Sequence, residues 1–252
     1  MRKPLISGVS ILVLAVLAWA GGDPWKSKPY TQWDKNDVQA VLQVSPWVKA
    51  NVSAAGAWHP DGTVAADSVQ GTGSPAGGVG GKGATSDGAL PGQTGGTAKN
   101  MNAGPQMYNI LWWSSRIIRQ AEVRSAVLRG LMTPEQAEQA LAKEPEFYQV
   151  DVAGPNMYIF QKRGEDAFKD AAFIELKKPS KRKVNPVSVV FQKDANGNVI
   201  GAVFNFPRKD SGGEPLINPD EKEIDFSLRV ADAWIRVAFN PKQMVDSKGQ
   251  DL

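Results

Sequence analysis

The sequence predicts an α+β fold: an antiparallel sheet or small β-sandwich-like domain covered by one αα-hairpin, with a signal peptide and a long Gly-rich disordered segment. Six segments after residue 146 have strand patterns, and several alternate polar and apolar residues as half-buried strands do. Two amphipathic helix patterns lie before them. Asn196-Gly197, between two of the segments, is typical of a tight hairpin turn because both residues tolerate a positive φ.

The chain divides into four parts by composition. We expect a signal peptide at residues 1–20, an aromatic helical segment docking on the domain at 21–52, a Gly-rich flexible linker at 53–104, and the α+β domain at 105–252. The linker holds 14 of the 25 glycines and hardly any large apolar residue. Such a composition buries too little apolar surface to offset the loss of chain entropy on folding.

A secretory signal is expected at the N-terminus. Arg2 and Lys3 precede an apolar run that is shorter than the roughly 20 residues of a membrane-spanning helix. Ala18 and Ala20 suit signal peptidase, so cleavage after Ala20 would leave an exported chain without a transmembrane span, in the periplasm or outside the cell. An uncleaved signal anchor is the alternative, because Trp19 lies inside the cleavage motif.

The aromatic segment is expected to fold onto the domain. Apolar residues at i, i+3 and i+4 spacing predict a short helix over residues 34–44. Ser45-Pro46 predicts a second helix start, since Ser is a common N-cap and Pro a common first helical residue. Trp33 and Trp47 are too large and apolar to remain in water, so we expect them to pack on the domain. The alternative is a recognition peptide whose aromatic residues dock on a partner.

The domain begins with one predicted strand and the helical hairpin. Ser115 caps a helix over 116–129 that ends at Gly130, and Thr133-Pro134 with Gln136 forms the capping box of a second helix. The predicted strands cover residues 107–113, 147–152, 173–177, 187–191, 199–206, 224–230 and 234–239.

Composition excludes several kinds of chemistry. There is no Cys and one His, so disulfides, thiolate metal sites and multi-histidine metal sites are excluded, and no cofactor is expected. The formal charge of +3 falls to +1 without Arg2 and Lys3, which gives no net field that favours nucleic acid. The Gly-x-x-x-x-Gly-Lys motif and the His-Glu-x-x-His motif are absent.

Four tryptophans are candidate ligand or partner contacts. Adjacent strand residues face opposite sides, so Trp112 and Trp113 send one indole to the core and the other to a sheet surface or ligand pocket. Trp33 and Trp47 complete the set. The basic run at residues 177–183 is a second candidate, for anionic lipid head groups or acidic polysaccharide, and a solvated loop is its simpler interpretation.

Three stretches carry a family resemblance. They are Tyr30-Thr31-Gln32-Trp33, Ser45-Pro46-Trp47-Val48-Lys49, and the tail at residues 235–245. The chain resembles a group of uncharacterised exported bacterial proteins, which have no assigned activity. The resemblance implies an exported, periplasmic setting in a bacterium and transfers no functional residue.

We expect a non-catalytic binding or assembly module of the cell envelope, with an envelope protein or a glycan as its partner and not nucleic acid. A secreted carboxylate-dependent hydrolase such as a glycosidase is one alternative, with Asp151, Glu175 or Asp232 as candidate groups, because that chemistry needs only two carboxyl groups. A self-assembling surface fibre subunit is the other alternative, and it requires an unpaired edge strand.

Overall fold

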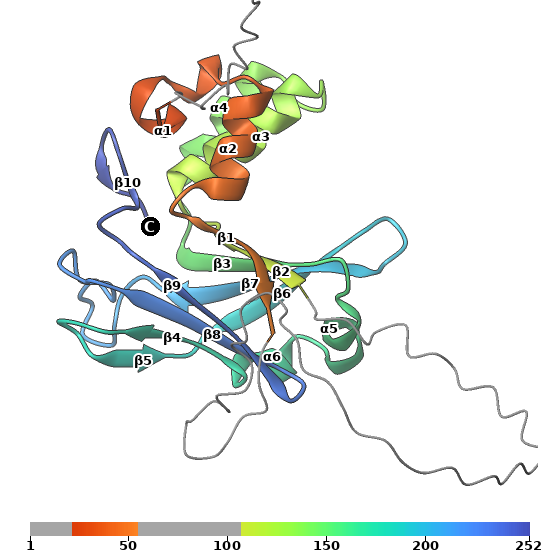
Figure 1. Ribbon diagram of the computed structural model, residues 1–252, viewed down its shortest axis with the longest axis vertical. Coiled ribbons are helices and arrows are strands. Elements are labelled where there is room, and N and C mark those ends of the chain that lie inside the picture. Colours follow the sequence, from red (N-terminus) through yellow and green to blue (C-terminus); the bar gives the residue numbers. More distant parts are fainter. Residues whose placement is uncertain (1–21, 55–106) are drawn as a thin grey trace, which may run out of the picture.

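The computed structural model describes residues 22–54 and 107–252 (Figure 1). The expected signal peptide and nearly all of the expected linker lie outside these ranges. The fold is α+β with antiparallel sheets, as the sequence predicts. Within these two ranges, no helix is long and apolar enough to span a membrane.

The elements follow in chain order. The helical elements are α1 (Pro24–Ser27), η1 (Tyr30–Gln32), α2 (Lys35–Val44), α3 (Arg116–Leu128), α4 (Pro134–Ala142), α5 (Tyr158–Arg163) and α6 (Asp166–Lys169). The strands are β1 (Val48–Ser53), β2 (Met107–Trp112), β3 (Phe147–Ala153), β4 (Ala172–Leu176), β5 (Arg182–Val184), β6 (Ser188–Lys193), β7 (Val199–Pro207), β8 (Ile224–Val230), β9 (Ala233–Phe239), β10 (Val245–Asp246) and β11 (Gly249–Gln250).

The longer strands form two antiparallel sheets. One has five strands in the order β1-β2-β3-β7-β6, the other has four in the order β5-β4-β8-β9, and β10 pairs with β11. The predicted Asn196-Gly197 turn joins β6 to β7, and Gly197 has a φ of +81° that favours glycine. The predicted strand at 224–230 has the same bounds as β8.

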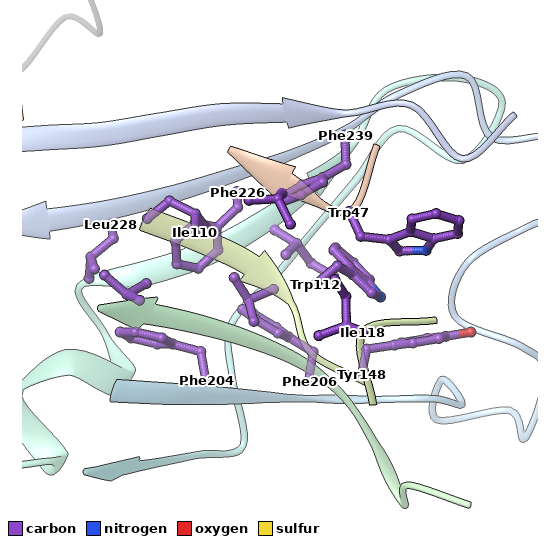
Figure 2. Close-up of a cluster of buried hydrophobic side chains, with 14 of the residues drawn as sticks. Trp47, Ile110, Trp112, Ile118, Tyr148, Phe204, Phe206, Phe226, Leu228 and Phe239 are labelled. Carbon is purple, nitrogen blue, oxygen red and sulfur yellow. The ribbon is translucent and has the colours of Figure 1, made fainter. Parts of the chain in front are cut away.

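The main core lies between the two sheets (Figure 2). Phe226 of the four-stranded sheet lies 5.5 Å from Phe204 of the five-stranded sheet, measured between ring centroids. Trp112 and Phe239 make a second contact between the sheets at 5.3 Å. All four side chains are fully buried, and rings at these distances add to the burial of apolar surface. Each sheet therefore covers the inner face of the other.

The αα-hairpin forms as predicted, but it lies in a group of helices at one end of the five-stranded sheet (Figure 1). Its helix α3 packs between α2 and α4. Ser115 caps α3 by accepting the N–H of Ile118, and Thr133 and Gln136 form the predicted capping box of α4. Helix α3 packs against α2, and its buried residues Ile117, Ile118 and Ala121 belong to the same hydrophobic core as the residues between the sheets.

The N-terminal segment is part of this fold. The prediction of a second helix start at Ser45-Pro46 is wrong, because the chain turns there and continues as β1. The backbone N–H of Trp112 donates to the carbonyl of Trp47, and β1 then pairs with β2. A strand in this place provides hydrogen-bond partners for the backbone N–H and C=O groups of β2, which a helix would not do. Trp47 itself is fully buried.

Candidate functional site

The outer face of the four-stranded sheet carries a cluster of cations and aromatic rings. We define the cationic face as Phe173 on β4, Lys183 on β5, Arg229 on β8, and Trp234 and Arg236 on β9. Strand alternation places these residues outward, because their neighbours on the strands point into the core between the sheets. The lysine and both arginines are exposed, and the two rings are half-buried.

The two rings meet at the centre of this face. Phe173 and Trp234 lie 6.0 Å apart in an edge-to-face arrangement. Ser227 pairs with Phe173 on one side and with Arg236 on the other, so a small side chain lies between Phe173 and Arg236 in the strand register. Ser227 is buried although it lies on the outer side of the sheet. The two rings form an apolar base for the cations.

Each ring holds one cation. The ammonium of Lys183 lies 3.6 Å from the centroid of the Phe173 ring, and the guanidinium of Arg236 lies 5.2 Å from that of Trp234. A cation above an aromatic ring is attracted by the negative face of the ring. The rings therefore restrict where the two charges lie and prepare them to meet an anion.

The cationic face is hollowed in two adjacent places. The first depression, of about 370 Å³, is lined by all five residues of the cationic face together with Asp170 and Ala171. The second, of about 440 Å³, is lined by Phe173, Lys183 and further residues of β4 and of the segment leading into β5. Those further residues are Glu175, Leu176, Lys177, Lys181 and Arg182. The two depressions meet at Phe173 and Lys183.

Ion pairs neutralise only part of this surface. Lys177 bridges Asp225 and Glu175 at 2.8 and 3.2 Å, and its hydrogen bond to Asp225 raises the pKa of its ammonium. Arg182 pairs with Asp210 at 2.8 Å. Within residues 22–54 and 107–252, no ion pair includes Lys183, Arg229 or Arg236. These three charges surround the first depression, whose single acidic lining residue is Asp170.

The four predicted tryptophans do not form one site. Trp33, Trp47 and Trp112 are at most 1% exposed, and they contribute to the hydrophobic core. Trp113 follows the last residue of β2 and is half-buried. Its indole N–H donates to Glu122 at 2.7 Å, and it lines a depression of about 170 Å³ beside α3 and α4. Of the four, Trp113 is the one at the surface.

The three candidate carboxyl groups also lie apart. Glu175 is on β4 of the four-stranded sheet and pairs with Lys177, whereas Asp151 is on β3 of the other sheet. Asp232 lies in the turn after β8, and Glu175 pairs with Asp225 near the other end of that strand. Asp232 and Glu175 are therefore separated by most of the length of β8, on the order of 20 Å at about 3.3 Å per residue. The structure does not bring any two of the three together.

Asp151 nevertheless has an unusual environment. It is 9% exposed on the outer side of the five-stranded sheet, and its Oδ1 atom has no hydrogen-bond partner among the described residues. Burial, together with the charge of Glu122, raises the pKa of the Asp151 carboxyl to about 7. This group therefore exchanges a proton near neutral pH. No group of His, Cys, Asp and Glu suited to a metal ion was found in the described part of the chain.

Sequence reasoning missed most of the cationic face. The basic run at residues 177–183 was recognised, but Arg229, Trp234 and Arg236 are more than 40 residues away from it along the chain. The alternation in 224–230 predicts that Arg229 faces outward, whereas 234–239 is predicted as a strand without an assigned outer face. Only the pairing of β8 with β4 and β9 brings the three residues beside Phe173 and Lys183.

The arrangement is suited to bind anions, because fixed cations with few acidic neighbours form strong, charge-assisted hydrogen bonds to carboxylate, phosphate or sulfate. Comparisons with protein-family models, with curated proteins and with solved structures found no match. The function of the chain is therefore inferred from the geometry and charge of its surfaces.

Proposed function

We propose that the chain is an exported, non-catalytic binding module of the bacterial cell envelope, and that its cationic face takes an anionic ligand. The observation that carries this proposal is the set of three cations, Lys183, Arg229 and Arg236, around one depression. None of them takes part in an ion pair between described residues. Leaving such charges unpaired on a concave surface is unfavourable for stability and favourable for capturing an anion.

The rings support the same proposal. A lysine or arginine on a surface normally samples many conformations, and ordering it on binding costs free energy. Phe173 and Trp234 reduce that cost because they already hold Lys183 and Arg236 near their rings. This preorganisation is the reason to assign binding to the cationic face and not to any other group of exposed cations.

The fibre-subunit alternative receives less support. The edge strand β6 of the five-stranded sheet exposes Val190, but the N–H of Phe191 on that strand already donates to Glu165 at 2.8 Å. A strand added from another chain would have to displace this bond. The cationic face requires no such rearrangement to meet its ligand.

Calorimetric titration of the mature chain with polyanions tests the proposal. Polygalacturonate supplies carboxylates, dextran sulfate supplies sulfates, and dextran is the neutral control. We expect both polyanions to bind, with an affinity that falls as salt rises, and we expect dextran not to bind. The triple variant Lys183→Ala/Arg229→Ala/Arg236→Ala should lose at least about tenfold in affinity.

A matched variant separates the site from general charge. Arg163 on α5 and Lys193 on β6, an edge strand of the other sheet, are exposed cations that line neither depression. The variant Arg163→Ala/Lys193→Ala should bind nearly as well as the parent chain. Equal losses in the two variants, or no binding of either polyanion, would contradict the proposal.

A further inference from the structure

We infer that the ligand of the cationic face is an extended anionic polysaccharide, which crosses β5, β4, β8 and β9 and places anionic groups in both depressions. This inference rests on the proposed function and narrows it. It has three parts: the separation of the cations, the position of the acidic residues, and the state of the aromatic rings.

The cations are divided between two depressions. Arg229 and Arg236 line the first depression, Lys181 and Arg182 line the second, and Lys183 lines both. Arg236 is on β9 and Arg182 is on β5, at the two edges of the four-stranded sheet. These edge strands are three strand spacings apart, roughly 14 Å at about 4.8 Å each. A ligand that meets the cations of both depressions therefore needs more than one anionic group.

The second depression extends this row of positive charge. Lys181 and Arg182 line it together with Lys183, beyond the Phe173 ring as seen from β9. Positive side chains thus occur at both ends of the path across the four strands. A ligand with several anionic groups along its length fits this path, whereas a compact anion would use only one part of it.

Acidic residues define the direction of the path. Glu175 and Asp225 pair across β4 and β8, two residues along from Phe173 and Ser227. A polyanion lying along β4 or β8 would meet these carboxylates, which Lys177 only partly neutralises. A polyanion lying across the strands meets Glu175, which lines the second depression and pairs with Lys177, but not Asp225, which lines neither depression. The charge pattern therefore favours the crosswise direction.

The rings argue against stacked bases. Lys183 already covers the Phe173 ring at 3.6 Å, and Phe173 meets Trp234 edge to face. Binding of single-stranded nucleic acid uses free aromatic faces on which successive bases stack. The rings of this face hold cations instead, so the ligand is expected to contribute anionic groups and not planar bases.

The face also lacks the apolar groups used at a membrane surface. Binding in the membrane interface relies on large exposed apolar side chains that enter the lipid. In the described ranges, the large apolar side chains that are most exposed lie on other elements: Val44, Leu131, Tyr158, Val187, Val190 and Ile200. A hollowed cationic surface without them suits a hydrated polyanion better than a lipid layer. Among envelope polyanions, acidic polysaccharide has this chemistry.

Calorimetric titration with length-defined oligosaccharides tests the inference on the mature chain. One series is oligogalacturonates from the monosaccharide to the hexasaccharide, and the other is heparin oligosaccharides, which carry sulfates. We expect at least one series to show a rise in affinity of about tenfold or more between the disaccharide and the hexasaccharide, because longer ligands reach both depressions. Neutral cellohexaose should not bind.

Single variants locate the two ends of the ligand. Lys181→Ala in the second depression and Arg236→Ala in the first should each lower the affinity of the hexasaccharide several-fold more than that of the disaccharide. Lys193→Ala should change neither. A hexasaccharide that binds no more tightly than the monosaccharide would overturn the extended path.

Two further probes separate failure of the inference from failure of the proposed function. Tighter binding to phosphatidylglycerol vesicles or to oligodeoxythymidine than to both oligosaccharide series would overturn the polysaccharide, while an anionic ligand on the cationic face would stand. No binding of any anionic probe would overturn both. Phosphate alone, if it reproduced the full affinity, would show a site for one compact anion and would also contradict the inference.

Discussion

The indole N–H of Trp47 donates a hydrogen bond of 2.7 Å to the backbone carbonyl of Asp251, which lies 204 residues later in the chain. The carboxylate of the same Asp251 accepts the N–H groups of Arg116 and Ile117 at the start of α3, at 2.8 and 2.9 Å. The second-last residue therefore joins the turn before β1 to the first turn of a helix. It satisfies backbone donors that a helix start leaves without partners.

Asp251→Ala should lower the free energy of unfolding by about 2 kcal/mol, because the part-buried N–H of Arg116 and the buried N–H of Ile117 lose their acceptor. Urea titration followed by circular dichroism measures this change. Asp232→Ala, which removes an exposed carboxylate, is the matched control and should change stability little. Equal stability of the Asp251 variant and the parent chain would contradict the capping role.

Trp33→Ala and Trp47→Ala should each destabilise the chain by about 3 kcal/mol or more, because the truncation leaves a cavity in a packed core. Tyr158→Ala removes an aromatic side chain that is 55% exposed and should cost far less. Chemical unfolding of the three variants provides the comparison. If the two tryptophan variants are as stable as the parent chain, the result would instead favour an N-terminal segment whose aromatic residues dock on a partner.

The Asp151 carboxyl should make stability depend on pH. Its pKa is about 7 in the folded chain and near 3.8 in the unfolded chain, so the folded state holds the proton more tightly. The free energy of unfolding should fall as pH rises from about 4 to about 7. Between pH 5 and pH 8 this decrease should be on the order of 3 kcal/mol.

Asp151→Asn removes this titration while keeping a similar shape. Unfolding free energies measured from pH 5 to pH 8 should therefore fall less steeply in the variant, which should be the more stable protein at pH 8. Parallel curves for the variant and the parent chain would show that the carboxyl has no raised pKa.

Phe173→Leu tests whether the rings position the cations. The substitution leaves every charge of the cationic face in place but removes the ring beneath Lys183. We expect the affinity for polygalacturonate or dextran sulfate to fall by about threefold, in keeping with the modest strength of exposed cation–π contacts. Tyr158→Leu removes a ring that lies beside Lys162 on α5 and should leave the affinity unchanged.

The strands were largely predictable because their alternation is a local property of the sequence, as the identical bounds of β8 illustrate. The strand β1 was missed because Ser45-Pro46 is a typical helix start, and its partner β2 begins more than 50 residues later. Helix α5 was missed because it is short and depends on the stacking of Phe160 on Phe168 at 4.5 Å. The cationic face depends on the register between strands distant in sequence, which local patterns do not specify.

Nuclear magnetic resonance titration of the chain lacking residues 1–20 with hexagalacturonate or a heparin hexasaccharide tests the central claim most directly. The indole N–H of Trp234 is a well-placed probe, because it is buried and has no hydrogen-bond acceptor among the described residues. If the ligand binds the cationic face, the largest chemical-shift changes should fall on this indole and on Phe173, Lys183, Arg229 and Arg236. Changes centred on Trp113 and the depression beside α3 and α4, or no changes with either ligand, would contradict it.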